Sequence, residues 1–574
     1  MENTKKFYIT TSIAYANASP HIGFAMEVCQ ADALARYHRM KGDDVFFLSG
    51  TDENGLKIKK TALEKKTDPQ KFVDENSAKF QLLLDTLNVS NNDFIRTTDK
   101  NRHWPAAQKL WNKLVEAGDI YKNSYEGYYC VGCEAYLTEK DLINSKCPHH
   151  KKAPEKIKEE NYFFRLSKYS KRIQEKIESR ELEILPESRK NEILNIIKSG
   201  LRDVSFSRPK TVLDWGVPVP DDETQTMYVW CDALTNYISA LGYGDDSFKL
   251  RNATLLSSRT KPQRRERSKN IANAANFTLR SLSRYRSFGM TKKKDAHFVA
   301  QSSSTNFQKY WPADIHIIGK DILRFHAAIW PAMLLSAGLP LPKKIFVHGF
   351  ITSGGQKMSK SLGNVIDPFE VIDKYGVDAL RYYLLKEIPS GSDGDFSYER
   401  FEEVYQADLA NEIGNLTARI IALSIKTENQ NSPFRKGGGE DFVVGNEGNL
   451  KTKAESTWLD YEKLLNNFKL NEALETTRKF MSACDEYIEK NKPWQLKSEK
   501  KAEAIYNLLE SLRQIAWMIW PFLPETANKI FAQLFADEQE RKKELNKNLA
   551  EAQKWGGLKT GMKIKKGEIL FPRL

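Results

Sequence analysis

The 574-residue sequence lacks any run of about 18 apolar residues, so we predict no membrane span. Its first residues, MENTKKFYITTS, lack the apolar stretch of a secretory signal, and we expect a cytoplasmic protein. Six cysteines are too few for a disulfide framework in a chain of this length. The 31 glycines and 21 prolines are too few for disorder throughout, so we expect a sizeable core and about four domains.

The positive charge is concentrated in one segment. The chain carries a net charge of +13, and residues 249–309, with fifteen Lys or Arg and two acidic residues, account for all of it. Charge over the whole chain is therefore a poor indicator of nucleic-acid binding. We predict that this segment is mostly unfolded in isolation. It is either a phosphate-binding arm, or a solvated insertion or a corrupted reading frame without function.

The first 50 residues predict a βαβ unit. Residues 6–12 and 44–50 read as strands, and Gly42 is placed to end the helix between them. The apolar face of that helix is formed by Ile22, Met26, Cys29, Ala33 and Tyr37. Such a unit implies a parallel sheet.

The remaining pattern predicts a split domain followed by helices. An apolar cluster lies at residues 226–242, and strand, helix and strand follow one another over 314–348. From about residue 395 the pattern is helical, with a loop at 435–448 and no convincing strand before residues 569–574. We therefore predict an α/β fold, a split Rossmann-like doubly wound parallel sheet, followed by an all-α bundle.

Two motifs suit phosphate chemistry. The first is Pro20, His21, Ile22 and Gly23, where a strand turns into a helix whose N-terminus can hold a phosphate; the alternative is a helix-capping turn. The second is the run KMSKS at 357–361, which follows a double glycine. Its two lysines can neutralise the charge on a leaving pyrophosphate, and the alternative is a solvated lysine turn.

A third motif has the spacing of a zinc site. Cys130 and Cys133 are separated by two residues, and Cys147 and His150 repeat that spacing after thirteen more. Four such ligands form a closed tetrahedral Zn²⁺ site, so we predict a structural ion. His149 is an adjacent alternative ligand.

Together the first two motifs resemble the paired signatures of class I aminoacyl-tRNA synthetases. One departure is that Phe24 replaces the second histidine of the first signature. Further segments narrow the resemblance to the methionyl-tRNA synthetase family. They are residues 7–17, 50–53, 228–233, read as a substrate-pocket strand, and 319–321.

The resemblance implies the site residues. Those that contact ATP would be His21, Gly23, Gly319, Asp321, His348, Lys357, Ser359 and Lys360, with His21, Lys357 and Lys360 catalytic. Those that bind methionine would be Ile13, Tyr15, Asp52, Trp230, Tyr237 and His326. Aromatic rings bind thioethers favourably. Without the resemblance, Trp230 and Tyr237 would read as core residues and Asp52 as a helix cap, and Asn54 stands where a histidine is usual.

The implied reaction is ATP-dependent activation of L-methionine to methionyl-adenylate, with Mg²⁺ accompanying ATP, and transfer to the terminal adenosine of tRNA(Met). The residues that would read the anticodon are Asn411, Asn415, Arg419 and Trp494. Spacing by four places the first three on one helix face, and Trp494 taken alone reads equally as a buried bundle residue. We expect a monomer.

The implied domains divide the catalytic part around the zinc knuckle. They are a first catalytic half (1–118), a connective domain with the knuckle (119–205), a second half (206–248 and 310–340) interrupted by the basic insertion (249–309), a lysine-loop region (341–394) and an anticodon-binding bundle (395–574). Three alternatives stay open. One is a class I synthetase for another apolar amino acid, although the 336 residues between the signatures leave little room for an editing domain. The others are a tRNA-binding relative that has lost catalysis and a nucleotidyltransferase.

Overall fold

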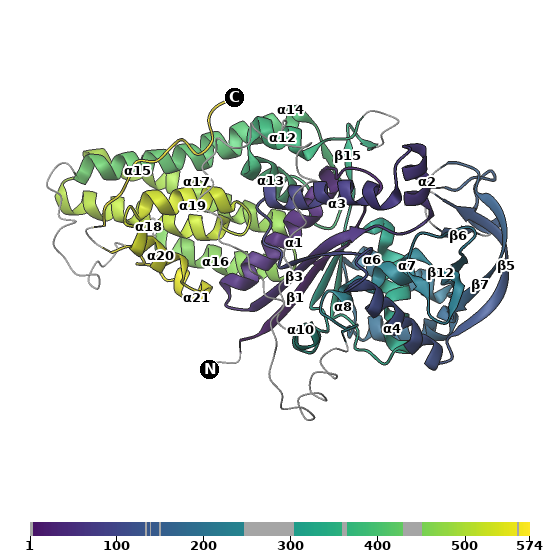
Figure 1. Cartoon of the computed structure of the whole chain (residues 1–574). Coiled ribbons are helices and arrows are strands. Elements are labelled where there is room, and N and C mark those ends of the chain that lie inside the picture. The colour runs from purple at the N-terminus through teal and green to yellow at the C-terminus, as the bar shows by residue number, and fades with distance from the viewer. Residues whose placement is uncertain are drawn as a thin grey trace, which may run out of the picture.

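The computed structural model describes residues 4–131, 135–137, 139–148, 151–245, 303–358, 364–428, 450–559 and 562–574. A twisted sheet lies near the middle of the molecule, with a smaller β-rich domain on one side and a helical domain on the other (Figure 1).

The central sheet contains seven strands, all parallel, in the order β2-β3-β1-β13-β14-β8, with β4 also paired to β3. They are β1 (Lys6–Thr11), β2 (Ala14–Tyr15), β3 (Asp44–Asp52), β4 (Asp93–Arg96), β8 (Glu183–Leu185), β13 (Ile315–Gly319) and β14 (Lys344–His348). The chain passes outward from β1 to β3 and β4 in one direction and from β13 to β14 in the other, where the earlier strand β8 completes the sheet. Ligands bind at such a switch point, beyond the carboxyl ends of the strands.

The predicted βαβ unit is confirmed. Helix α1 (Ile22–Met40) joins β1 to β3, and its N-cap is His21. The helix stops where Gly42 takes φ +87°, a conformation that glycine adopts without strain. All five residues of the predicted apolar face are buried.

Helices cover both faces of the sheet. Neighbouring residues of a strand point to opposite faces, and apolar side chains on both faces are buried under helices. In β1, Phe7 and Ile9 join the core around α1 and the helical domain, whereas Tyr8 joins the core on the other face. The helices of this part are α2 (Leu56–Glu64), α3 (Pro69–Thr86), α4 (His103–Glu116), α5 (Ser170–Glu178), α6 (Glu187–Lys198), α7 (Val229–Leu234), α8 (Asn236–Ser239), α10 (Ser303–Tyr310), a π-helix η5 (Phe325–Ile329) and α11 (Trp330–Ser336), with short 3₁₀ turns η1 (Glu139–Asp141), η2 (Leu166–Tyr169) and η4 (Lys320–Ile322).

The inserted domain is mostly antiparallel. One sheet has the order β6-β5-β7-β9 and a second has the order β10-β12-β11. Their strands are β5 (Ile120–Cys130), β6 (Ala135–Leu137), β7 (Glu155–Phe164), β9 (Val204–Ser205), β10 (Ser207–Pro209), β11 (Pro218–Val219) and β12 (Asp222–Met227). The predicted connective domain, residues 119–205, includes β8, which instead pairs with β14 in the central sheet. The boundary is wrong there, because long-range pairing rather than local pattern decides where a three-residue strand lies.

A small sheet and two helices lead to the helical domain. They are β15 (Ile351–Ser353), β16 (Gln356–Lys357), β17 (Gly394–Phe396), α12 (Pro368–Tyr375) and α13 (Val377–Lys386). Arg381 on α13 is fully buried and links α1 of the sheet domain to the helical domain. It donates to Asp32 on α1 at 2.8 Å and to the carbonyl oxygens of Pro521 and Phe522 at 3.1 and 2.7 Å.

The C-terminal part is a helical bundle, as predicted. Its elements are α14 (Tyr398–Val404), the π-helix η7 (Tyr405–Gly414), α15 (Asn415–Glu428), α16 (Leu450–Asn466), α17 (Leu470–Asn491), the 3₁₀ turn η9 (Pro493–Gln495), α18 (Ser498–Ile519), α19 (Pro524–Leu534), α20 (Glu538–Leu545) and α21 (Leu549–Ala552). The predicted loop at 435–448 lies outside the described residues. Residues 569–574, predicted as a strand, have no strand partner and instead pack on the bundle, where Tyr405 donates to the carbonyl oxygen of Pro572 at 2.9 Å.

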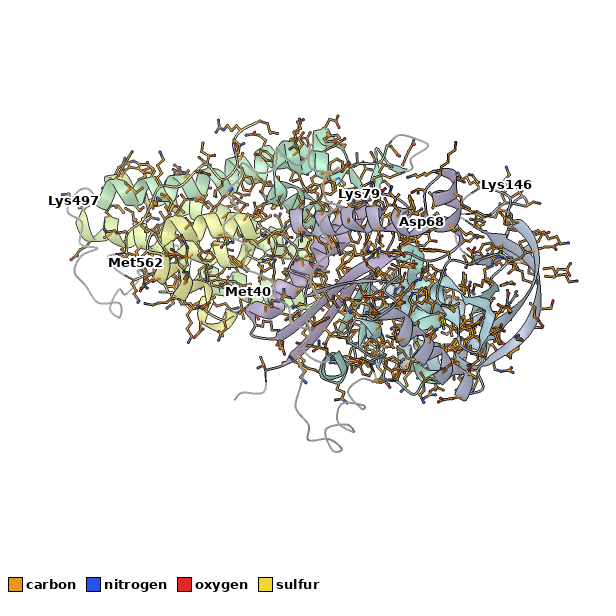
Figure 2. All side chains as sticks on the ribbon, viewed as in Figure 1. Met40, Asp68, Lys79, Lys146, Lys497 and Met562 are labelled. Atoms are coloured by element: carbon orange, nitrogen blue, oxygen red, sulfur yellow. The ribbon has the colours of Figure 1, made fainter. Side chains whose placement is uncertain are left out.

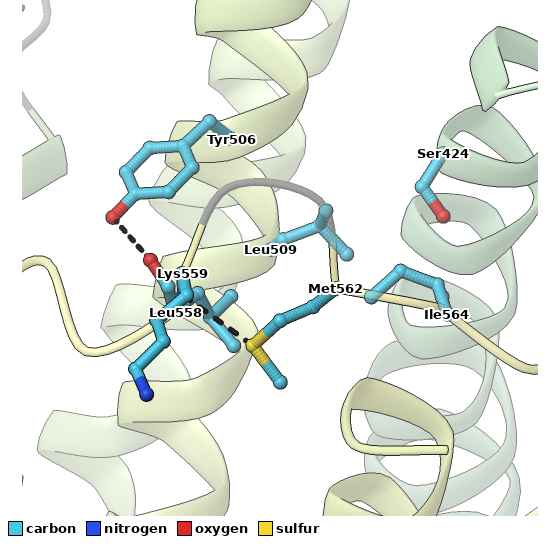
Figure 3. A pocket seen from close by; sticks show the side chains of 7 residues that line it. All are labelled: Ser424, Tyr506, Leu509, Leu558, Lys559, Met562 and Ile564. Carbon is cyan, nitrogen blue, oxygen red and sulfur yellow. Dashed lines mark hydrogen bonds between the residues drawn. The ribbon is translucent and has the colours of Figure 1, made fainter. Parts of the chain in front are cut away.

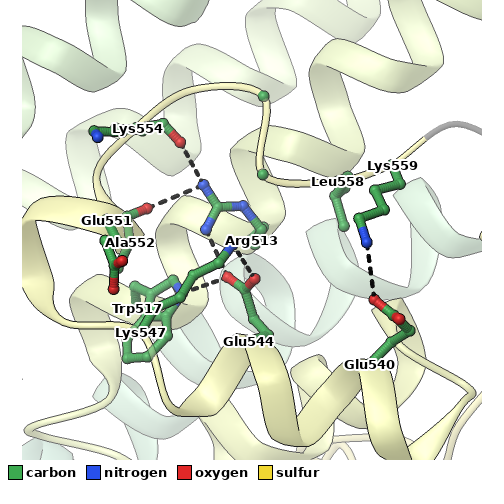
Figure 4. Close-up of polar contacts among 12 residues, drawn as sticks. Arg513, Trp517, Glu540, Glu544, Lys547, Glu551, Ala552, Lys554, Leu558 and Lys559 are labelled. Carbon is green, nitrogen blue, oxygen red and sulfur yellow. Dashed lines mark hydrogen bonds and ion pairs between the residues drawn. The ribbon is translucent and has the colours of Figure 1, made fainter. Parts of the chain in front are cut away.

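The C-terminal tail is held by a buried polar network. Arg513 on α18 donates to Glu510 at 2.7 Å. It also donates to Glu544 on α20 at 2.6 Å (Figure 4). Glu510 also accepts backbone N–H groups of Gly556 and Gly557 at 3.1 and 3.2 Å. The tail then crosses α18, and side chains of both line a small apolar cavity (Figure 3). This cavity lies within the helical domain, away from the edge of the sheet.

Side chains fill the space between α1 and the helical domain, where Met40 is labelled (Figure 2). Within the described ranges, no helix combines the length and apolar character that crossing a membrane requires.

Candidate functional site

The structure brings several predicted residues to one edge of the central sheet. Asp52 ends β3, Gly319 ends β13 and His348 ends β14, and in a parallel sheet these ends share one edge. A Cβ atom on Gly319 would lie 2.8 Å from Oδ1 of Asp321 and 3.6 Å from Cε1 of His348. Glycine therefore allows these two side chains to lie close to the strand end.

His21 caps α1 beside this edge. Its Nδ1 accepts the backbone N–H of Gly23 at 3.0 Å, so the proton of the neutral ring lies on Nε2. A Cβ atom on Gly23 would lie 2.8 Å from the Cε1 atom of that ring, which is why glycine is needed at this position. The capping interpretation of the motif is thus correct, and in this tautomer the ring carries its proton on Nε2.

Phe24 lies in the core rather than in the site. It is 7% exposed and packs edge-to-face on Phe80, with ring centroids 4.9 Å apart. The second position of the signature therefore supports α1 in this chain and presents no donor at the edge.

Glu27 is a residue of this edge that the sequence did not predict. Its Oε1 accepts from the backbone N and Oγ of Ser12 at 2.8 and 2.7 Å, and its Oε2 accepts from Nε2 of His348 at 2.8 Å. The Nδ1 of His348 donates to the carbonyl oxygen of Gly349 at 2.7 Å. Both ring nitrogens therefore face oxygen atoms, an arrangement that favours the protonated ring. Burial opposes this charge, but the hydrogen bond and charge of Glu27 raise the pKa of His348 above its usual value.

An aromatic cluster, the candidate methionine pocket, adjoins the same edge, where Tyr237 packs on His316 of β13 with ring centroids 4.2 Å apart. The hydroxyl of Tyr237 lies 2.6 Å from Nε2 of His326, whose Nδ1 lies 3.0 Å from the carbonyl oxygen of Ile322. Because Nδ1 must donate to that carbonyl, Nε2 accepts and Tyr237 donates. Burial lowers the pKa of His326 to about 4, so the ring is neutral at physiological pH. Trp230 stacks on Phe325, with centroids 3.6 Å apart and planes 9° apart.

The other predicted pocket residues lie beside it. Tyr15 in β2 is paired in register with Asp52 in β3, and Ile13 precedes β2 and is partly buried. Asp52 is 6% exposed and accepts from the hydroxyl of Thr97 at 3.4 Å. Within the described residues, the buried indole N–H of Trp230 has no hydrogen-bond partner.

The predicted pocket strand at 228–233 is wrong. Strand β12 ends at Met227 and the chain enters α7. The buried contacts of Asp232 explain why the chain forms a helix here. Its carboxylate is fully buried and lies 2.6 Å from both Nε2 of His103 and the side-chain nitrogen of Asn54. Asn54, which we left out of the site, thus supports the helix that carries Trp230.

Of the lysine motif, the backbone of Lys357 is described, and Ser359 and Lys360 lie outside the described residues. Lys357 ends β16, the second strand of a hairpin whose first strand is β15. Gly354 and Gly355 form the turn with φ of +60° and +72°. The positive φ at both positions explains the double glycine.

The predicted anticodon residues lie at the start of the helical domain. Asn411 and Asn415 are exposed, but Asn411 lies in the π-helix η7, so the three residues do not follow the even α-helical spacing that we predicted. Arg419 forms ion pairs with Glu489 and, at 3.4 Å, with Asp485 on α17. Trp494 is 49% exposed, which excludes the buried interpretation.

Comparisons with known proteins agree with this arrangement. The family model described as tRNA synthetases class I (M) matches residues 7–155, 138–253 and 290–421, and that of the anticodon-binding domain of tRNA ligase matches residues 449–565. The methionine–tRNA ligase of Caldanaerobacter subterraneus subsp. tengcongensis is 40% identical over 575 residues, which cover 99% of this chain and 79% of the relative. That of Rickettsia felis is 40% identical over 580 residues, covering 100% and 99%.

The chain belongs to the methionine–tRNA ligase family. A solved structure of Mycobacterium tuberculosis methionyl-tRNA synthetase in complex with methionyl-adenylate has a TM-score of 0.82 and 33% identity, and the match covers 99% of this chain and 100% of that one. The chain is therefore an enzyme of this family, a ligase that joins methionine to tRNA. The matched stretches of the first family model leave out residues 254–289, within the basic segment 249–309. The expectation of an unfolded segment is wrong at its end, because α10 begins at Ser303 and Phe307 packs on Tyr243 with ring centroids 5.1 Å apart.

Only two of the four predicted zinc ligands lie among the described residues. Cys130 and Cys147 are buried, whereas Cys133 and His150 lie outside the described part. Among the described residues, no group of three or more metal-ligating side chains occurs. The backbone at Cys147 forms a tight turn, in which its N–H donates to Lys152 and its carbonyl accepts from Lys151, at 2.9 and 2.7 Å. Such a turn with a buried thiol fits a metal knuckle.

Proposed function

We propose that the edge of the sheet and the adjoining aromatic pocket form one active site, which activates L-methionine with ATP and transfers it to the terminal adenosine of tRNA(Met). The proposal is supported by the contact of α1, which His21 caps, with His348 through Glu27, by the closeness of Gly319 to His348, and by the hydrogen-bonded pair of Tyr237 and His326. These residues come from segments as far apart as positions 21 and 348.

In this proposal, His21 donates from Nε2 to a phosphate oxygen. The N-terminus of α1 adds its dipole and backbone N–H groups to the same place. Gly23 allows the ring to lie close to the first turn of the helix. Lys357 and Lys360 would stabilise the negative charge that develops on the leaving pyrophosphate.

The amino acid would lie in the aromatic pocket. Tyr15, Trp230, Tyr237 and His326 would surround the thioether, since sulfur packs favourably on aromatic rings. Ile13 would offer backbone contacts, and the buried carboxylate of Asp52 would pair with the substrate ammonium. The unpartnered indole N–H of Trp230 supports a pocket in which a ligand supplies an acceptor.

The first step is in-line attack of the methionine carboxylate on the α-phosphate of ATP. The nucleophile arrives ionised, so the protein needs no general base, and catalysis comes from positioning and charge stabilisation. Asp321 and His348, which flank Gly319, would help to hold the nucleotide against the edge. Mg²⁺ accompanies ATP and neutralises part of the phosphate charge.

The helical domain would recognise the anticodon of tRNA(Met). The exposed ring of Trp494 offers a stacking surface, and the amides of Asn411 and Asn415 with the guanidinium of Arg419 offer hydrogen bonds to base edges. The same proposal includes a monomer, which gel filtration tests against a mass of 65.9 kDa, and a place in the cytoplasm, where translation needs its product.

Cys130, Cys133, Cys147 and His150 would hold a structural zinc ion. The ion would stabilise the tip of the inserted domain, since a closed four-ligand site has no open position for substrate.

ATP–pyrophosphate exchange dependent on methionine tests the proposal. We expect exchange with methionine, and its loss in His21→Ala and Lys357→Ala but not in Lys171→Ala, a substitution of an exposed lysine on α5. Exchange with a different amino acid would contradict the pocket assignment. Retained tRNA binding without any exchange would instead support the interpretation that the chain has lost catalysis.

A further inference from the structure

The segment from Ser392 to Phe396 is seated directly on the nucleotide edge. A Cβ atom on Gly349 would lie 2.2 Å from the carbonyl carbon of Ser392 and 2.4 Å from the backbone nitrogen of Asp393. Only glycine permits this approach of one backbone to the other. The contact falls one residue beyond His348, the last residue of β14.

Asp393 fixes this segment to two strand ends. Its Oδ1 accepts the backbone N–H of Phe350 at 2.9 Å and its two oxygens lie 2.7 and 2.6 Å from Nζ of Lys320. Lys320 directly follows Gly319, the end of β13. The segment is therefore attached to the same edge that would hold ATP.

Asp395, two residues later, holds the lysine hairpin. Its Oδ1 accepts the hydroxyl of Thr352 at 2.5 Å and the backbone N–H of Gly355 at 2.9 Å. Thr352 is paired in register with Asp395 in one neighbouring strand and with Lys357 in the other. The carboxylate is thus bonded both to the strand opposite Lys357 and to the turn that leads to it.

A turn of two glycines has unusual backbone freedom, and a carboxylate that accepts one of its N–H groups restricts that freedom. We propose that Asp395 is a positioning residue for the pyrophosphate-forming step, which sets where the backbone of Lys357 stands relative to the nucleotide edge. Asp393, two residues earlier, anchors the same segment to the end of β13 through its ion pair with Lys320. The inference rests on the role of Lys357 in the proposed function.

Three variants test it by steady-state ATP–pyrophosphate exchange. Asp395→Ala should lower kcat about tenfold or more, because both hydrogen bonds to the hairpin are lost. The KM for methionine should stay unchanged, since the aromatic pocket lies on other elements. Asp395→Asn keeps an oxygen that accepts both donors and should restore kcat to within about threefold of the wild type. Glu399→Ala, an exposed carboxylate on α14, is the matched control and should have no effect.

A kcat in Asp395→Ala equal to that of the control would overturn the inference. It would also be overturned if Asp395→Asn were as impaired as the alanine variant, or if the loss came with a lower melting temperature and a matching rise in the KM for methionine. Lys357→Ala, measured in parallel, separates the two levels. If Lys357→Ala retains exchange, the proposed role of Lys357 fails; if it loses exchange while Asp395→Ala does not, only the positioning role fails.

Discussion

Replacement of Glu27 by alanine removes an acceptor shared by the ends of β1 and β14. Three donors lose a partner: the backbone N–H of Ser12, the hydroxyl of Ser12 and Nε2 of His348. Hydrogen bonds to a charged group contribute about 1.5–3 kcal/mol each. Water can replace Glu27 as a partner of partly exposed Ser12 but not of buried His348. We therefore expect the substitution to destabilise this edge of the sheet by about 3 kcal/mol.

If this loss falls on the nucleotide site, about 3 kcal/mol corresponds to roughly a hundredfold fall in kcat/KM for ATP. The KM for methionine should change little, because Tyr237 and His326 are held by their own hydrogen bonds. Glu27→Gln should be milder. Its amide oxygen can still accept from Ser12, and its amide nitrogen can donate to a neutral His348.

The same pair of variants predicts a pH dependence. The pKa of His348 is raised in the folded chain, although burial opposes this, because of the hydrogen bond and charge of Glu27. The stability from this pair is fully present below the unfolded pKa of about 6.5 and is lost as the pH rises through the folded pKa. The free energy of unfolding of the wild type should therefore fall as the pH rises above about 6.5. Glu27→Gln favours neutral His348 and should remove this part of the slope.

Urea unfolding followed by tryptophan fluorescence, from about pH 6 to about pH 9, measures the slope in both proteins. Exchange kinetics with ATP and methionine varied separately measure the activity. An equal slope in the wild type and in Glu27→Gln, or an unchanged kcat/KM for ATP in Glu27→Ala, would refute the reasoning.

Four further predictions concern the turn at His21, the methionine pocket, the zinc ligands and the basic segment. Gly23→Ala places a Cβ atom 2.8 Å from the capping ring, so it should weaken the cap by about 1 kcal/mol and lower the rate of exchange. Tyr237→Phe leaves Nε2 of His326 without its donor and should lower kcat/KM for methionine about tenfold to a hundredfold in exchange assays. Because the pKa of His326 is about 4, this loss should be equal at about pH 6 and about pH 8. Cys147→Ala should remove bound zinc, measured by elemental analysis, while Cys484→Ala should not. Replacement of residues 254–289, which the family model leaves out, by a short linker should leave exchange intact, and its loss would show that the segment contributes to the site.

Local pattern was sufficient for the first βαβ unit. The spacing of apolar residues, a capping residue at position 21 and Gly42 at the helix end all act within one element, so the sequence alone predicts them. The run Tyr228 to Trp230 has strand propensity, but the buried carboxylate of Asp232 pairs with residues more than a hundred positions away. Tertiary contacts thus overrode propensity, and α7 formed instead of a strand.

Candidate site residues that belong to short sequence motifs could be predicted. Those whose role depends on contacts between distant positions were missed. Glu27 meets Ser12 and His348 at sequence separations of 15 and 321, which no periodicity reveals. Its local signal is weak, because α1 also buries other polar residues such as Gln30 and Asp32. The π-helix η7 was missed for a similar reason, because its wider turn leaves no distinct sequence pattern around Asn411.

The assignment of one active site to the sheet edge and the aromatic cluster can be tested by a structure of the protein bound to a non-hydrolysable methionyl-adenylate analogue. We expect the phosphate to lie within hydrogen-bond reach of Nε2 of His21 and the thioether to lie against Trp230 and the Tyr237–His326 pair. An analogue bound with its phosphate away from the N-terminus of α1, or with its thioether elsewhere, would show that the site is assigned wrongly.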